Sequence, residues 1–219
     1  MKSAPKHNQR KEHLDHVALD VEFLLISVIQ GVALVTLATS AVGPMISMET
    51  GTWPYIAVAF LFILIFWSGA IIHAVSFIDW PIDLIHSFLY FLASIIEIVA
   101  ITNLMHPVLW FFFLFLFQVV ALVLYRYDLW MIEVRKGKFT SAAGKMLYKH
   151  IYSEQKKELQ QYIPASTVLF FISFLVLYFY PVFLIQEILV GVQLLFALIF
   201  LYREVQTFKK RSELLLKFE

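Results

Sequence analysis

Residues 107–125 read PVLWFFFLFLFQVVALVLY, and this stretch decides the class of fold. It contains no Asp, Glu, Lys or Arg, and its one amide side chain is Gln118. Crossing the hydrocarbon core of a bilayer as a helix takes about 20 apolar residues. The stretch therefore predicts a membrane-spanning helix, whose start is marked by the turn residues His106 and Pro107.

Five further apolar segments of similar length flank it. The whole set is Leu19–Val42, Pro54–Ile78, Ile82–Asn103, Pro107–Tyr125, Ile163–Tyr180 and Val182–Tyr202. Gly or Pro marks most of the breaks between them, as expected of turns. Hydrophobic residues make up 61% of the chain, against about 45–50% in soluble domains. The sequence predicts an all-α integral membrane protein with a bundle of six transmembrane helices.

The basic residues indicate how this bundle is oriented. All 17 Lys and Arg residues fall in three blocks: before Glu12, between Arg126 and Lys157, and from Arg203 onward. Lys and Arg are concentrated in the cytoplasmic loops of membrane proteins. We therefore expect both termini to be cytoplasmic, in a plasma or inner membrane. The expected order is an N-terminal segment (1–18), helices 1–4 (19–125), a basic connection (126–162), a hairpin of helices 5 and 6 (163–202) and a basic tail (203–219).

The basic connection contains a segment with helical periodicity. Between Thr140 and Gln161, apolar residues recur on one side and lysines occupy the others. The apolar set is Ala143, Met146, Leu147, Ile151 and Leu159. This pattern predicts a cytoplasmic amphipathic helix on the anionic lipids of the inner leaflet. A solvated linker helix is the alternative interpretation.

The third span carries a polar stripe. Asp83, Ser87, Tyr90, Ser94 and Glu97 recur at alternating steps of four and three, with His86 beside them. Residues at this spacing share one face of a helix. The face either packs against neighbouring helices through hydrogen bonds or serves a function, since ionisable residues within a membrane are costly to retain.

The topology sorts the polar residues of the spans by depth. The residues expected to line an ion pathway are Asp83, His86, Tyr90, Glu97, Gln30, Gln118, Gln193 and Glu187. Those expected at its cytoplasmic mouth are Glu22, His73, Asp79 and Asp128. Polar groups at every depth on several helices are typical of a path for water, protons or ions.

The sequence also allows a metal site and excludes several other mechanisms. Imidazole and carboxylate groups suit a divalent metal, and His73, His86 and Asp83 are the candidate ligands, although no HExxH motif accompanies them. The absence of Cys excludes disulfides, thiolate metal sites and cysteine nucleophiles. The spans contain no Lys for a retinal Schiff base and no Arg series for a voltage sensor. A net charge of +1 gives no sign of nucleic-acid binding.

Three functions are consistent with these patterns. The first is a channel or transporter subunit that moves protons or small cations along the third span, as a homo-oligomer because a small bundle rarely encloses a wide pore. The second is an enzyme at the inner leaflet that uses a His/Asp metal site. The third is a non-catalytic membrane subunit whose basic connection docks a soluble partner.

Two expectations concern single residues. Glu97 should be buried, and either protonated or hydrogen-bonded to Gln186, Glu187 or His106, because no Lys or Arg lies at its depth. His73 and His86 lie at similar distances from Pro81 on consecutive antiparallel spans. They should therefore lie at one level and form a unit with Asp79 or Asp83.

Overall fold

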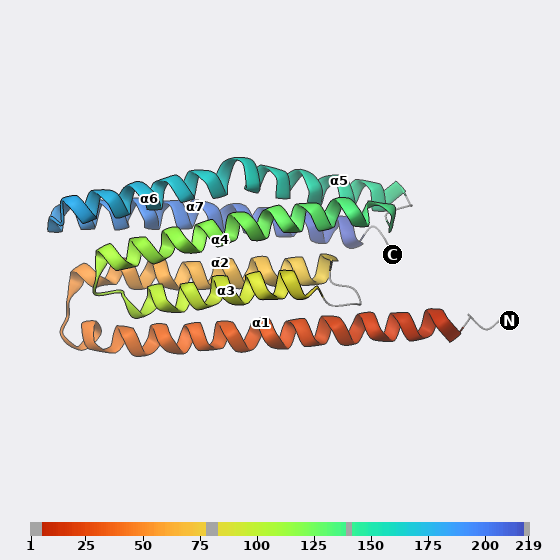
Figure 1. Cartoon of the computed structure of the whole chain (residues 1–219), viewed down its shortest axis with the longest axis horizontal. Coiled ribbons are helices and arrows are strands. Elements are labelled where there is room, and N and C mark those ends of the chain that lie inside the picture. The colour runs from red at the N-terminus through yellow and green to blue at the C-terminus, as the bar shows by residue number, and fades with distance from the viewer. Residues whose placement is uncertain (1–5, 78–82, 139–141, 217–219) are drawn as a thin grey trace.

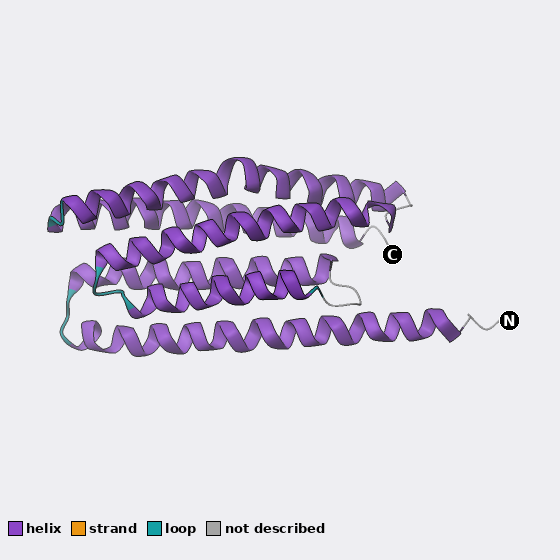
Figure 2. Cartoon of the chain, in the orientation of Figure 1, coloured by secondary structure: helices purple, strands orange, loops and turns teal. Residues whose placement is uncertain are grey.

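The computed structural model describes residues 6–77, 83–138 and 142–216, and the regular elements in these ranges are all helical (Figure 2). The main helices are α1 (Lys6–Ile46), α2 (Trp53–Phe77), α3 (Leu84–Thr102), α4 (Pro107–Val134), α5 (Ala142–Lys157), α6 (Ile163–Phe179) and α7 (Phe183–Leu216). Two short 3₁₀ segments, Thr50–Thr52 and Arg135–Lys138, and a π-helical turn, Glu158–Tyr162, complete the described chain.

Six helical segments within the described residues are long and apolar enough to cross a membrane. They are His13–Ile46, Thr50–Ala74, Leu84–Thr102, Pro107–Gly137, Gly144–Phe179 and Phe183–Arg211. This finding confirms the prediction of an all-helical protein with six helices of spanning length. Most helix ends lie within a few residues of the predicted span ends. The exceptions are the start of α1, the end of α4 and the end of α7, which extend well beyond the predicted spans on the side of the bundle where the chain termini lie.

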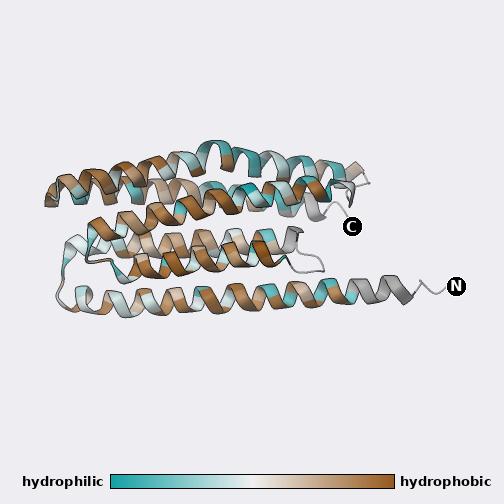
Figure 3. Cartoon of the chain, viewed as in Figure 1, coloured by the Kyte–Doolittle hydropathy of each residue, from teal (hydrophilic) through white to brown (hydrophobic). Residues whose placement is uncertain are grey.

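Both described ends of the chain lie at the same end of the bundle, and α5 lies there too (Figure 1). Hydrophilic residues gather at this end, whereas hydrophobic residues dominate the opposite half of α4 and α6 (Figure 3). We call the end with the termini the basic end and the opposite end the far end. The arrangement agrees with an even number of crossings, and the compartment that each end faces stays a prediction.

The helices are arranged as a closed ring. Going round it, α1 packs against α2, α2 against α7, α7 against α5, which continues into α6, α6 against α4, α4 against α3, and α3 against α1. Contact between α6 and α7 is sparse, although they form a hairpin. Every helix therefore has an inward side, and a side chain on that side faces protein instead of lipid.

Aromatic and aliphatic side chains fill the centre of the ring toward the far end. The Phe170 ring lies 5.8 Å from that of Phe62, and the Trp110 ring lies 5.9 Å from that of Tyr55. All four side chains belong to one buried apolar cluster. Close packing of this kind is a main source of stability in a bilayer, where lipid is as apolar as the side chains. The far end of the bundle is thus a packed core.

Helix α5 differs from the predicted surface helix. It runs through the π-helical turn directly into α6 and packs against α4 and α7. Leu147 and Ile151, from the predicted apolar side, pack against Ile132 of α4, whereas Met146 is exposed. Protein therefore covers much of the apolar face that we expected lipid to cover. Contact of the lysine-bearing side with anionic lipid stays a prediction.

Asp83 fixes the start of α3. Its Oδ1 accepts hydrogen bonds from the backbone N–H groups of Ile85 (3.0 Å) and His86 (3.2 Å), and its Oδ2 accepts one from the Tyr127 hydroxyl (2.7 Å). This is helix N-capping combined with a tie to α4. Burial by itself would raise the pKa of Asp83, but these hydrogen bonds outweigh it and leave the pKa below its usual value.

Replacing Asp83 with Ala should destabilise the fold by about 1 kcal/mol at neutral pH, because the cap is lost. A folded-state pKa below the unfolded one contributes stability above the unfolded pKa, which is lost as the pH falls through the folded pKa. The variant should therefore lose less stability on acidification than the wild type. Thermal unfolding in detergent from neutral pH to about pH 3 measures both effects. Asp83→Asn, which keeps a capping side chain, should be the milder change; equal stability of wild type and Asp83→Ala would contradict the capping role.

Candidate functional site

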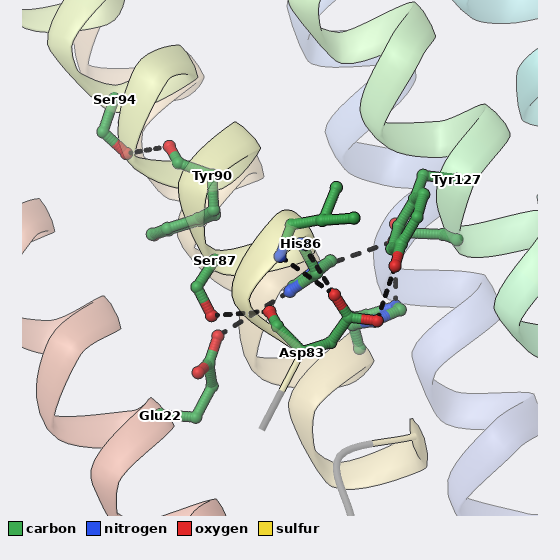
Figure 4. A network of polar contacts seen from close by, with 10 residues as sticks. Glu22, Asp83, His86, Ser87, Tyr90, Ser94 and Tyr127 are labelled. Carbon is green, nitrogen blue, oxygen red and sulfur yellow. Dashed lines mark hydrogen bonds and ion pairs between the residues drawn. The ribbon is translucent and has the colours of Figure 1, made fainter. Parts of the chain in front are cut away.

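Four helices each contribute one ionisable side chain to a buried cluster near the basic end. Glu22 comes from α1, His73 from α2, His86 from α3 and Asp128 from α4, and none is more than about a tenth exposed. We call these four residues the inner cluster. Figure 4 shows Glu22 pointing toward His86 across the α1–α3 interface. The cluster forms because adjacent members of the ring turn one polar residue inward at the same level.

The distances within the inner cluster follow a pattern. His86 Nε2 lies 3.5 Å from Asp128 Oδ1, and His86 Nδ1 lies 3.8 Å from Glu22 Oε1. His73 Nδ1 lies 3.7 Å from Asp128 Oδ2. The two imidazole rings stack with their centroids 4.5 Å apart and their planes 18° apart. Hydrogen bonds between charged nitrogen and oxygen atoms are typically about 2.7–2.9 Å long, so these groups face one another without closing ordinary hydrogen bonds.

The carboxylate shared by the two histidines differs from the one we expected. Asp128 lies beside both rings, whereas Asp83 caps α3 and bonds Tyr127. We expected Asp128 at the mouth of the pathway but not beside the histidines, because the sequence does not indicate how α4 is rotated about its axis. The other expected partner, Asp79, lies outside the described residues.

A second set of polar side chains continues from the inner cluster along α3. Gln30 of α1 donates hydrogen bonds to the Tyr90 hydroxyl (3.2 Å) and to Glu97 Oε2 (3.4 Å). Ser94, between them on the helix, bonds the carbonyl of Tyr90 (2.9 Å; Figure 4). All four are buried. We call Gln30, Tyr90, Ser94 and Glu97 the upper column.

Glu97 is buried, as predicted, but its hydrogen-bond partner is not one of the residues that we expected. Its hydrogen bond comes from Gln30 of α1 and not from Gln186, Glu187 or His106. Glu187 lies instead at the far end, next to Gly51: a Cβ atom added to Gly51 would be 3.1 Å from Glu187 Oε1. His106 is exposed. Both Gln30 and Glu97 were expected along the pathway, but nothing in the sequence indicated that their side chains would be hydrogen-bonded.

Two other predicted pathway residues have local hydrogen-bond partners. Ser166 of α6 donates to Gln118 Oε1 of α4 (2.9 Å), and the Trp110 indole N–H of α4 donates to Gln193 Oε1 of α7 (3.0 Å). Such interhelical hydrogen bonds stabilise membrane bundles. Gln193 therefore ties α7 to α4 at the apolar core, whereas Gln118 also borders the cavity described next.

A cavity of about 110 Å³ lies inside the ring beside the inner cluster. His73, His86 and Asp128 form one part of its wall, and Tyr90 and Gln118 lie farther along. Glu158, Glu204 and Arg211 line the side formed by the π-helical turn and α7. Since one water needs only about 10–15 Å³ by this kind of measure, the cavity can hold several waters or a hydrated ion.

The charged residues beside the π-helical turn were not anticipated as part of the bundle. Arg203 of α7 donates to Glu154 Oε2 (3.2 Å) and Glu158 Oε1 (3.3 Å), and its guanidinium lies 3.8 Å from the centre of the Tyr162 ring. Glu154 and Glu158 are four residues apart, as are neighbours on one helix face. The four-residue spacing of these two acids, together with a basic residue on α7, is the sequence pattern that could have indicated this contact.

The fold and composition define a class, the multi-pass helical membrane proteins, to which the six helices of spanning length assign this chain. Within that class nothing more particular is identified: no family model, curated protein or solved structure matches the chain. The features of the described chain that bear on function are the inner cluster, the upper column and the cavity.

Proposed function

We propose that the chain is a membrane transport protein for small cations, protons included, with a pathway that enters at the inner cluster and follows the upper column along α3. The observation that carries this proposal is the inner cluster itself. Four ionisable side chains from four different helices meet in the interior of the bundle, and three of them, His73, His86 and Asp128, border a cavity. Ionisable groups are costly to retain at such depth and commonly mark ion or substrate pathways.

The chemistry of the pathway favours cations. The inner cluster and the upper column contribute carboxyl, imidazole, hydroxyl and amide groups, whose oxygen and nitrogen lone pairs can replace part of an ion's hydration shell. Two of the nearby guanidinium groups face carboxyl groups: Arg203 bonds Glu154 and Glu158, and Arg211 faces Glu158 and Glu204. An anion pathway would instead be expected to expose unpaired cationic side chains.

The far half of the bundle favours a transporter over an open channel. Beyond Glu97, the inward face of α3 presents Ala100 and Ile101, and the turn after the helix presents Leu104; all three are buried in the apolar cluster. The pathway therefore ends at a packed core in this conformation. Passage needs the helices to rearrange, as in alternating access. Assembly into a homo-oligomer is part of the same proposal, because a second copy could cover exposed apolar surface of the ring.

Reconstitution into liposomes tests the proposal. Purified full-length protein is incorporated, opposite ion gradients are imposed, and the internal pH and the concentrations of Na⁺, K⁺, Zn²⁺ and Mn²⁺ are followed with selective dyes. The proposal expects movement of at least one of these ions well above that in protein-free liposomes. If every ion crosses both kinds of liposome at the same rate, the proposal is wrong.

The orientation that places the inner cluster on the cytoplasmic side is tested separately. The chain has no Cys, so Glu49→Cys and Lys145→Cys each create a unique label site, and both positions are exposed. With an impermeant thiol reagent added outside intact cells, the Glu49→Cys variant should react at once and the Lys145→Cys variant only after permeabilisation. Labelling of both from the same side would contradict the six-span topology, and exchanged sides would reverse the orientation.

A further inference from the structure

We infer that His73, His86 and Asp128 form a binding site for one divalent transition-metal ion, such as Zn²⁺. The inference deepens the proposed function by naming the class of ion, and to that extent it rests on it. The binding site itself, however, follows from local geometry. One ligand atom from each of the three residues lies within 4.8 Å of the other two, so a single ion can be within reach of all three.

The separations between these atoms match a shared ion better than direct hydrogen bonds. Zinc binds histidine nitrogen at about 2.0–2.1 Å and carboxylate oxygen at about 2.0–2.2 Å, which at tetrahedral angles puts neighbouring ligand atoms about 3.3–3.5 Å apart. The His86 Nε2 to Asp128 Oδ1 distance is 3.5 Å, and the His73 Nδ1 to Asp128 Oδ2 distance is 3.7 Å. The two distances involve different oxygens of the Asp128 carboxylate, and the three ligand atoms lie within 4.8 Å of one another. Coordination therefore requires side-chain shifts on the order of 1 Å, and it requires one imidazole to turn out of the stacked pair, because a metal lies in the plane of the ring that binds it.

Glu22 supplies the support that a histidine ligand needs. A metal-bound imidazole almost always donates its second ring N–H to a carboxylate, a carbonyl or water, which fixes its orientation. Asp128 faces Nε2 of His86, and Glu22 Oε1 lies on the other side of the ring, 3.8 Å from Nδ1. Among the described residues, neither His86 Nδ1 nor Glu22 Oε2 has a hydrogen-bond partner. In this arrangement Glu22 accepts a hydrogen bond from the Nδ1–H of His86, and His86 Nε2 and Asp128 bind the ion.

The charges around the site favour a cation. Three carboxyl groups, from Glu22, Asp83 and Asp128, lie close enough to act on the two imidazoles. Two guanidinium groups, from Arg135 and Arg211, oppose them, but Arg211 also faces Glu158 and Glu204. The adjoining cavity leaves room for water in the remaining coordination positions. Two histidines and one carboxylate with open positions suit zinc and other late first-row metals rather than Ca²⁺ or Mg²⁺.

Equilibrium metal binding by the purified full-length protein in detergent tests this inference. After chelator treatment and dialysis, Zn²⁺ titration followed by calorimetry and elemental analysis should show one tightly bound equivalent. Bound Co²⁺ should give visible absorption bands characteristic of nitrogen and oxygen ligands. His73→Gln and Asp128→Asn should each weaken Zn²⁺ binding at least about 100-fold, more than the loss of an outer-shell partner usually does. Glu22→Gln should weaken it about 10-fold.

His106→Gln is the matched control, because it removes a histidine that is exposed at the far end. It should bind Zn²⁺ like the wild type. The inference is overturned if the wild type binds no Zn²⁺ saturably, or if folded His73→Gln and Asp128→Asn proteins, checked by circular dichroism and gel filtration, bind it unchanged. Cation flux without metal binding would reject this site and leave the proposed function standing. Metal binding without flux of any ion would support this site and reject the proposed transport function.

Discussion

Cation flux through liposomes containing Asp128→Asn should fall about 100-fold relative to the wild type. Within the part of the chain that the structure describes, Asp128 is the carboxylate that forms close contacts with both His73 and His86. Amide replacement removes its charge with little change in size. The contact between this carboxylate and a passing cation should be worth about as much as a hydrogen bond to a charged group, about 1.5–3 kcal/mol, and a loss of about 2.7 kcal/mol corresponds to a factor of about 100. Initial rates at matched protein content measure the effect.

Glu133→Gln provides the matched control for this experiment. It makes the same chemical change on the same helix, at an exposed carboxylate that accepts a hydrogen bond from Tyr152. Its flux should stay within about twofold of the wild type, because surface substitutions change free energies by only about 0.5 kcal/mol. Equal loss in both variants would point to a general effect on the fold and would contradict a specific role for Asp128.

Replacing Arg203 with Met should destabilise the protein by about 3 kcal/mol or more. The guanidinium bonds Glu154 and Glu158 and stacks on Tyr162, so it ties α7 to the turn between α5 and α6. Removing one partner of a buried ion pair leaves the other charge uncompensated, which typically costs about 3–5 kcal/mol. Glu158 is buried and would be the group left without this partner. Thermal or denaturant unfolding in detergent measures the loss.

The double variant Arg203→Met/Glu158→Gln separates charge from packing. If the uncompensated charge causes the loss, neutralising Glu158 should restore a large part of the stability. Lys209→Met, at an exposed position on the same helix, should have little effect. Additive losses in the double variant would show that the Arg203 contribution comes from packing on Tyr162, and wild-type stability of Arg203→Met would contradict the account.

The number of spanning helices, and their ends at the far end of the bundle, could be predicted because a bilayer requires long apolar segments and turns between them. The polar stripe of α3 could also be predicted, since helical spacing alone puts Tyr90, Ser94 and Glu97 on one face. His73 and His86 were expected at one level because both are counted from the same turn. Each of these inferences depends on distances along the chain, which the sequence gives directly.

The contacts across the ring could not be predicted in the same way. They depend on the rotation of each helix and on which helices are neighbours, and many packings satisfy the same hydropathy pattern. Asp128 therefore replaced Asp83 beside the histidines, and Gln30 replaced the expected partners of Glu97. Arg203 and Glu158 fell in the predicted basic tail and basic connection, outside the predicted spans, yet α4, α5 and α7 extend the bundle and largely bury their contact.

If small cations pass along the buried face of α3, two adjacent positions on this helix should respond in opposite ways to chemical modification. Ser94 is 1% exposed in the upper column, whereas Ile95 is 57% exposed on the outside of the bundle. In the Cys-free chain, Ser94→Cys and Ile95→Cys are each treated with a small cationic thiol reagent during cation flux in liposomes. Modification at position 94 should stop the flux, and modification at position 95 should leave it unchanged. Flux that continues after treatment of Ser94→Cys, or that stops equally in both variants, would contradict a pathway along this face.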